Sequence, residues 1–118
     1  MAILSTGPID NNAVGGVRPT QQVTVKIVNR DAINISNILI LGYYLNGIRT
    51  LYVSELFNVS PNEVVTKNYF ANFDAYEFVF TTGNLAAVET EVSVWGKDAA
   101  GHLIDAHRVV ASEELGAE

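Results

Sequence analysis

The clearest feature of the sequence is an alternation of apolar and polar positions that begins near residue 22. Between residues 22 and 29, Val23, Val25 and Ile27 alternate with polar side chains, which is the period of a strand with one buried face. Similar short runs follow, and clusters of Gly, Asn, Asp and Pro separate them about every eight to twelve residues. The pattern predicts seven strands, at residues 22–29, 38–45, 48–57, 63–70, 75–82, 88–97 and 102–111.

Two of these strands carry further signals. Residues 38–45 are continuously apolar, which is typical of a strand that is covered on both faces or that faces a partner chain. Asn46 and Gly47 follow directly, and both residues tolerate the positive φ of a type I′ turn, so they predict a tight hairpin. In the predicted strand 75–82, three aromatic rings point to one side and are expected to anchor the core: Tyr76, Phe78 and Phe80.

Short strands with regular turns and no helical period indicate an all-β protein. We predict an antiparallel β-sandwich of seven to eight strands with a jelly-roll-like topology. The sandwich domain is expected to span residues 21–112, and residues 113–118 are expected to form an acidic C-terminal tail. Such a sandwich has open edges, where unpaired backbone groups recruit other chains.

Residues 1–20 differ from the rest of the chain. Glycine and proline residues interrupt them, and their aliphatic residues follow no strand or helix period. We interpret them as an extended N-terminal connector arm, because they are too apolar for a solvated tail. Such an arm can pair with an open sheet edge of a neighbouring subunit. The predicted subunit-interface residues are Ile3, Leu4, Ile9 and Val14, and the predicted hinge between arm and domain consists of Gly15 and Gly16.

Composition limits the possible functions. The chain has 118 residues and a mass of 12.8 kDa, which suits a single domain. Its net charge of −6 has the wrong sign for binding nucleic acid or an anionic membrane surface. The absence of cysteine excludes disulfides, thiolate metal sites and cysteine nucleophiles. Neither a secretory signal nor a membrane-spanning segment is readable in the sequence.

The two histidines invite a metal or catalytic interpretation. His102 and His107 have an odd separation, so on one strand they point to opposite faces and cannot share a metal ion. Asp105 and His107 do share a face, and Ser93 could lie across the strand pair, but no nucleophile elbow or Gly-rich oxyanion loop accompanies them. We therefore predict no catalytic, cofactor-binding or metal-binding residues and expect a protein that is not an enzyme.

Aromatic residues raise the alternative of a carbohydrate platform. The candidates are Tyr43, Tyr44, Tyr52, Tyr69 and Trp95. All of them lie inside predicted strands, whereas binding residues usually lie on loops. Packing in the core or at an interface is therefore the favoured interpretation.

Short strings in the body of the chain carry a family resemblance. They are Arg18-Pro19-Thr20, Gln22-Val23-Thr24-Val25, Tyr69-Phe70-Ala71, Asp74, Val94-Trp95-Gly96-Lys97 and Ala106-His107-Arg108. With these strings, residues 18–111 resemble uncharacterised proteins of spore-forming Firmicutes. The architecture also resembles the subunits of endospore appendage fibres, which are small jelly-roll domains preceded by an N-terminal connector.

The resemblance implies a head-to-tail fibre in which each connector docks into the next domain. It also implies a location on the spore surface or exosporium, with assembly inside the mother cell and therefore no secretion signal. The implied partners are copies of the same chain and spore-surface anchor and tip proteins. The better-known appendage subunits have connector cysteines that cross-link the fibre, and this chain has none. Covalent reinforcement of that kind is therefore excluded.

The expected function is thus that of a structural subunit that self-assembles by donating its N-terminal arm to a neighbour, without nucleic acid, membrane or cofactor. The alternative is a carbohydrate- or surface-binding jelly-roll module, similar to an adhesin or lectin. An enzyme built on Asp105 and His107 is the third choice.

Overall fold

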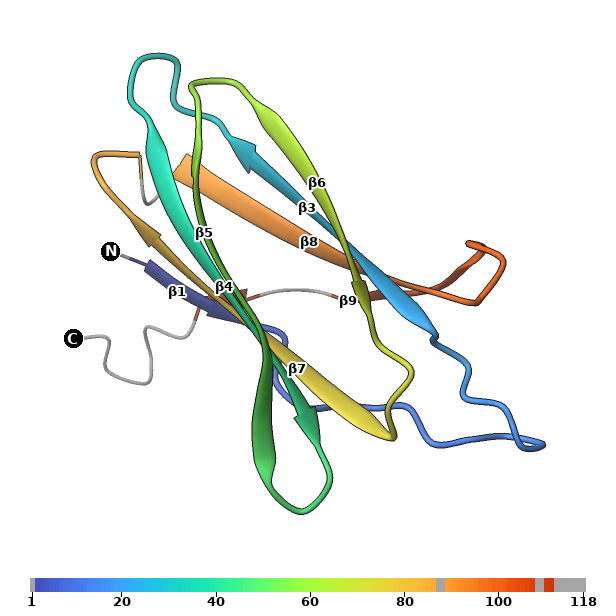
Figure 1. The fold of residues 1–118 in the computed structure, drawn as a ribbon. Coiled ribbons are helices and arrows are strands. Elements are labelled where there is room, and N and C mark those ends of the chain that lie inside the picture. The colour runs from blue at the N-terminus through green and yellow to red at the C-terminus, as the bar shows by residue number, and fades with distance from the viewer. Residues whose placement is uncertain (1, 87–88, 108–109, 112–118) are drawn as a thin grey trace.

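In the computed structural model, which describes residues 2–86, 89–107 and 110–111, the chain forms two antiparallel β-sheets packed as a sandwich (Figure 1). The described strands are β1 (Ala2–Ser5), β2 (Ile9–Asp10), β3 (Gln22–Asn29), β4 (Ser36–Leu45), β5 (Arg49–Val59), β6 (Val64–Phe70), β7 (Ala75–Gly83), β8 (Thr90–Lys97), β9 (Leu103–His107) and β10 (Val110–Ala111). The predicted all-β, jelly-roll-like sandwich is confirmed.

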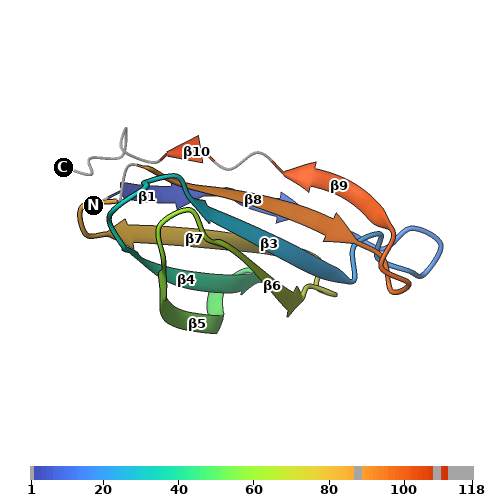
Figure 2. The same ribbon diagram turned by 90° about the horizontal axis from the view of Figure 1, so that it is seen from above.

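The strands divide unequally between the two sheets. The larger sheet has six strands in the order β10–β1–β7–β4–β5, with β2 continuing beside β1 along β7. The smaller sheet has four strands in the order β6–β3–β8–β9. The edge strands β5 and β6 lie at one flank of the sandwich, and β9 and β10 lie at the other (Figure 2).

Alternate residues of the predicted pattern fill the space between the sheets. The fully buried cluster consists of Val23, Val25, Ile27, Ile38, Ile40, Val59, Ala71, Tyr76, Phe78, Phe80 and Val94. The three rings of β7 lie in the core, as predicted. Every member of the cluster comes from β3, β4, β5, β7, β8 or the bend after β6, so among the residues whose burial the structure describes the two N-terminal strands contribute none of the fully buried ones.

Two predicted local features differ from the structure. The loop between β4 and β5 has three residues, because Leu45 pairs with Arg49. Only Gly47 among the three has a positive φ, of 87°, whereas a type I′ turn needs two central residues with positive φ. The type I′ prediction for Asn46 and Gly47 is therefore wrong. The predicted strand 102–111 is divided, because β9 belongs to the smaller sheet and β10 to the larger one. The predicted tail, residues 113–118, lies outside the described residues.

Strand β4 approaches its neighbours most closely at Gly42, next to a register irregularity against β5. A Cβ atom at Gly42 would lie 2.9 Å from the Cε2 ring carbon of Phe78 and 2.9 Å from the Cβ of Val53. Real Cβ atoms do not come so close to other atoms, so glycine is the residue that fits between the ring and the adjacent strand.

Replacing Gly42 by alanine should lower the free energy of unfolding by about 1–3 kcal/mol, because the new methyl group forces Phe78 or Val53 to move. The matched control is Gly83→Ala on β7, where the nearest atom to a new Cβ is 4.0 Å away. That control should change the free energy of unfolding by less than about 1 kcal/mol. Urea denaturation followed by circular dichroism measures both, and equal stabilities would contradict the close approach.

Candidate assembly surface

The N-terminal segment lies along strand β7 of its own chain. In β1, the pairs run from Ala2–Thr82 to Ser5–Val79, and in β2 the pair Ile9–Tyr76 continues the same ladder. Three residues between the two strands face two residues of β7, so the segment bulges once and then resumes its pairing. The predicted arm, residues 1–20, is therefore not detached in the single chain, because the edge of β7 offers its backbone groups to it.

Strand β1 fills a slot that is bounded on both sides. It pairs antiparallel with β7 and also with β10, where Leu4 lies opposite Ala111. Leu4 and Ile9 pack, partly buried, against the core cluster of their own chain. Ile3 is half-buried on the outer side of the sheet, opposite Thr81. Three of the four predicted interface residues, Ile3, Leu4 and Ile9, thus lie in the two strands that pair with β7.

The exception is Val14, which is 73% exposed and pairs with Val17 in an isolated bridge. Their backbone N–H groups donate to each other's carbonyl oxygens at 2.8 and 3.2 Å. Gly15 and Gly16 between them have φ values of 61° and 85°, which makes them the two central residues of a tight turn. In the single chain these glycines form the tip of a small hairpin, and their role as a hinge stays a prediction.

Asn11 fixes the base of this hairpin. Its buried side-chain amide donates to the carbonyl oxygens of Thr20 at 2.8 Å and Phe73 at 2.9 Å, and its Oδ1 accepts from the Thr20 N–H at 2.9 Å. The backbone N–H of Asn11 donates to the Asp74 carbonyl at 2.7 Å. Arg18 adds an ion pair with Asp74 at 2.9 Å. Sequence reasoning missed this anchor, since one asparagine among several polar residues gives no local signal.

A second position with a glycine at positive φ lies upstream of the Asn11 anchor. Upstream of Asn11, Gly7 has a φ of 66°, and no atom lies within 4 Å of the position its Cβ would take. Pro8 follows and has no N–H to contribute to the ladder. In the linker 6–8 between β1 and β2, Thr6 is held to β7 by two hydrogen bonds with Phe78, and the Gly7 N–H donates to Ser5 Oγ at 2.9 Å. An exchanging β1 has to break these bonds, and Gly7 and Pro8 are then a second candidate hinge beside the predicted Gly15 and Gly16.

The outer face of the larger sheet is apolar. On β4, Leu39 lies beside Leu56 of β5, Leu41 lies beside Val79 of β7, and Tyr43 follows in the same row. Leu56 is 72% exposed, and no described element covers this face. The inner residues of β4 are buried in the core. Of the two interpretations of residues 38–45, coverage on both faces is therefore not seen within the described chain, and a face toward a partner stays a prediction.

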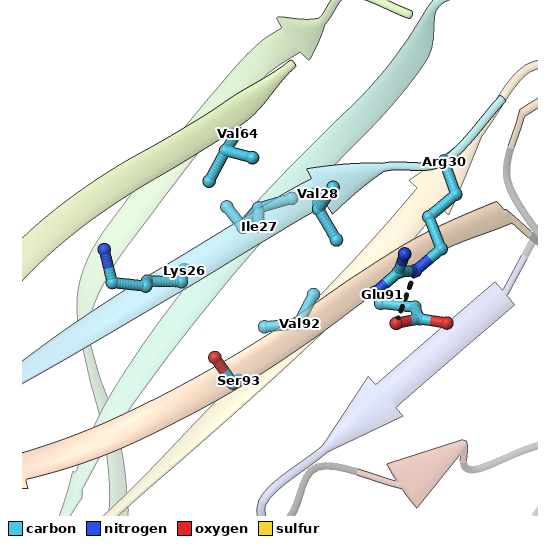
Figure 3. Close-up of a pocket in the computed structure, with 8 residues that line it drawn as sticks. All are labelled: Lys26, Ile27, Val28, Arg30, Val64, Glu91, Val92 and Ser93. Carbon is cyan, nitrogen blue, oxygen red and sulfur yellow. Dashed lines mark ion pairs between the residues drawn. The ribbon is translucent and has the colours of Figure 1, made fainter. Parts of the chain in front are cut away.

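The outer face of the smaller sheet is mixed, because Lys26, Glu91 and Ser93 share it with Val28 and Val64. It carries a shallow hollow of about 430 Å³ over β3, β6 and β8 (Figure 3). Lys26, Arg30 and Glu91 border the hollow, and Arg30 pairs with Glu91 at 2.8 Å. Both side chains of the pair are 62% exposed. Exposed and mutually paired charges of this kind contribute little to binding or stability.

The described residues show few contacts that support a metal or catalytic role for the two histidines. His102 precedes β9, and its Nδ1 lies 3.5 Å from the Asp98 carboxylate. The backbone N–H of His102 donates to Asp98, which lowers the pKa of that carboxyl. Within the described part of the chain, no three metal-ligating side chains gather, and no helix has the length and apolar character to cross a membrane. The side chains of Asp105 and His107 lie outside what the structure describes.

The five aromatic candidates for a carbohydrate platform do not share one surface. Tyr44 and Tyr52 each pack against Phe73 with ring centroids 4.9 Å apart. The Tyr69 hydroxyl donates to Glu55, and burial together with this bond raises the pKa of Tyr69. The remaining two lie on opposite outer faces: the Arg49 guanidinium covers the Tyr43 ring at 3.6 Å, and Trp95 donates to Ser93 at 2.8 Å.

Comparisons with known proteins place the fold only. No protein-family model matches the sequence, and no curated protein matches it. Among solved structures, the Anabaena sensory rhodopsin transducer is similar, with 12% identity and a TM-score of 0.51 over 77% of this chain and 89% of its own. Thermotoga maritima 1070 is similar too, with 11% identity and a TM-score of 0.50 over 94% of this chain and 90% of its own.

The replacement Asn11→Ala should lower the free energy of unfolding by about 2–4 kcal/mol, because it leaves the buried N–H and carbonyl of Thr20 without their partner. The control Asn12→Ala changes an exposed neighbour and should cost less than about 0.5 kcal/mol. Chemical denaturation measures both variants. A stability for Asn11→Ala as high as that of the control would show that the anchor does not hold the segment.

Proposed function

We propose that this protein is a structural subunit that self-assembles head to tail into a fibre, in which β1 of one chain fills the slot between β7 and β10 of the next. The observation that carries the proposal is that β1 fills a two-sided slot without supplying any of the fully buried core residues. The resemblance to appendage subunits with N-terminal connectors agrees with it. The spore-surface location and the anchor and tip proteins stay predictions of that resemblance.

Exchange of β1 between chains conserves its contacts. In a neighbour's slot, β1 would make the same two antiparallel ladders and place Leu4 against the same core, so the exchanged and closed forms have similar contact energies. Exchange of an identical element is a low-cost route to assembly and is favoured by high protein concentration. Because each chain offers one β1 and one slot, the contact does not have to close and can extend into a fibre.

The linker and the anchor give the exchange a direction. Residues 1–6, extended from the linker 6–8, reach roughly 20 Å at about 3.3 Å per residue. Asn11 and β2 stay bound to their own chain. The departing strand therefore leaves every subunit from the same point, and a fixed departure point repeats the same geometry from one subunit to the next.

The exchange is testable with an engineered disulfide, because the chain has no cysteine of its own. The Thr6 N–H donates to the Phe78 carbonyl at 3.0 Å, which makes that position a hydrogen-bonded pair. By the alternation of an antiparallel ladder, Ile3 and Thr81 form a pair without hydrogen bonds, with Cα atoms about 4.5 Å apart. That separation allows a disulfide.

We expect the double variant Ile3→Cys/Thr81→Cys, when it is allowed to assemble at high concentration and is then oxidised, to give a ladder of covalent multimers on a non-reducing gel. Each single-cysteine variant is the control and should stop at the dimer. A disulfide-closed monomer as the sole product, in samples prepared as concentrated protein, would contradict the exchange. Negative-stain microscopy of a chain that lacks residues 2–6 completes the test, since filaments that persist without β1 would also refute the proposal.

A further inference from the structure

We propose that the outer face of the larger sheet is a second self-association surface, on which two copies of the chain pack sheet against sheet about a twofold axis. The surface is defined by outward residues of β4, β5 and β7: Leu39, Leu41, Tyr43, Leu51, Leu56 and Val79. This contact goes beyond strand exchange, because it uses the face of the sheet and not its β7 edge.

The exposure of the surface is unusual for a soluble domain. Leu51 and Leu56 are 50% and 72% exposed, and they adjoin the apolar row of β4. The equivalent face of the smaller sheet places Thr24, Lys26 and Ser93 in its central rows. Contiguous apolar patches that soluble proteins leave exposed mark sites of association. The difference between the faces lies in continuity, because Leu39, Leu41 and Tyr43 follow one another along β4, whereas Thr24, Lys26 and Val28 follow one another along β3.

The shape of the surface suits a second copy. A hollow of about 350 Å³ is lined by the exposed Leu56 together with Asn37, Leu39, Thr81 and Gly83. A twofold axis places the same patch on both partners. With an axis that passes beside this hollow, the Leu56 side chain of each copy enters the hollow of the other.

Charge favours the same occupant. The central strands β4, β5 and β7 place only two charged residues on this face, Arg49 and Glu77, and these pair at 3.0 Å. The hydrogen bond to Glu77 raises the pKa of Arg49, and the opposite formal charges of the two side chains cancel. The whole chain carries a charge of −6, which makes two copies repel each other. A face without net charge is where that repulsion is weakest.

The area of the surface suits a weak dimer. Strand β4 has ten residues, which corresponds to about 33 Å, and the three strands β4, β5 and β7, about 4.8 Å apart, span roughly 14 Å. A face of roughly 33 by 14 Å offers about 460 Å² per partner, which is below the roughly 800 Å² of a standard stable interface, so we expect a weak, concentration-dependent dimer. Sheets also stack face to face with aligned strands in sandwich proteins, so the packing itself is a common one.

The test uses the Ile3→Cys/Thr81→Cys chain, oxidised at high dilution so that β1 is locked in its own slot. Because Thr81 lines the hollow, the reduced Thr81→Cys single variant is compared with the unchanged chain in parallel, and an equal dissociation constant for these two shows that the substitution itself leaves the surface intact. Strand exchange plays no part in the locked chain, so the result does not depend on the proposed fibre. Sedimentation velocity over a range of concentrations should show a monomer–dimer equilibrium. Leu56→Lys in the locked chain should raise the dissociation constant of the dimer roughly tenfold to a hundredfold, because it places two like charges in the interface.

The matched control is Val64→Lys, which introduces the same charge at a 60% exposed aliphatic residue on the outer face of β6. It should leave the dimer unchanged. Leu51→Lys is a second variant of the proposed surface, in case the first one fails to fold by circular dichroism. A locked chain that stays monomeric at every concentration would overturn the proposal and assign the face to a different partner. A dimer that resists both surface variants, or weakens equally with the control, would overturn it as well.

Discussion

The pairing of strand β7 along both of its edges is the constraint on which the rest of the structure depends. Tyr76, Phe78 and Phe80 fix its inner side in the core. One edge pairs with β4, and the other pairs with β1 and β2. Backbone groups in a covered sheet need partners, so the second edge must be filled by some strand. A strand from the same chain and one from a neighbour meet the same backbone groups there, which is the physical basis for exchange.

Short apolar and alternating runs between turn residues were enough to predict β3 to β8 to within two residues at each end. Strand β4 was predicted from a continuous apolar run, and the strands beside it mainly from alternation. The prediction failed at residues 102–111, where the chain passes from one sheet to the other. The apolar and polar positions continue there without a glycine or proline after Gly101. A crossover of this kind depends on which sheet has a free edge, and that is not a local property of the sequence.

The sequence singled out the N-terminal segment as a candidate for assembly, but it did not show how that segment is attached to its own chain. The apolar residues of the N-terminal segment indicated that it is not a solvated tail, and the structure pairs it with β7 of its own chain. The anchoring of the segment was not predictable, since it depends on hydrogen bonds from Asn11 to a bend about sixty residues later in the sequence. Likewise, the apolar residues 38–45 indicate that both faces of β4 prefer burial. They do not say that only the inner face is covered by the chain itself.

The two proposed contacts would act in different directions and would not compete. Strand exchange joins chains within the plane of the larger sheet, whereas the outer surface joins them perpendicular to it. The outer surface centres on β4 and β5, which keep their places whichever chain supplies β1. A fibre that uses both contacts would be double, and each subunit would be held by two independent attachments. Detaching one subunit would require both to open together, so multivalency would supply the strength that a chain without cysteines cannot obtain from disulfides.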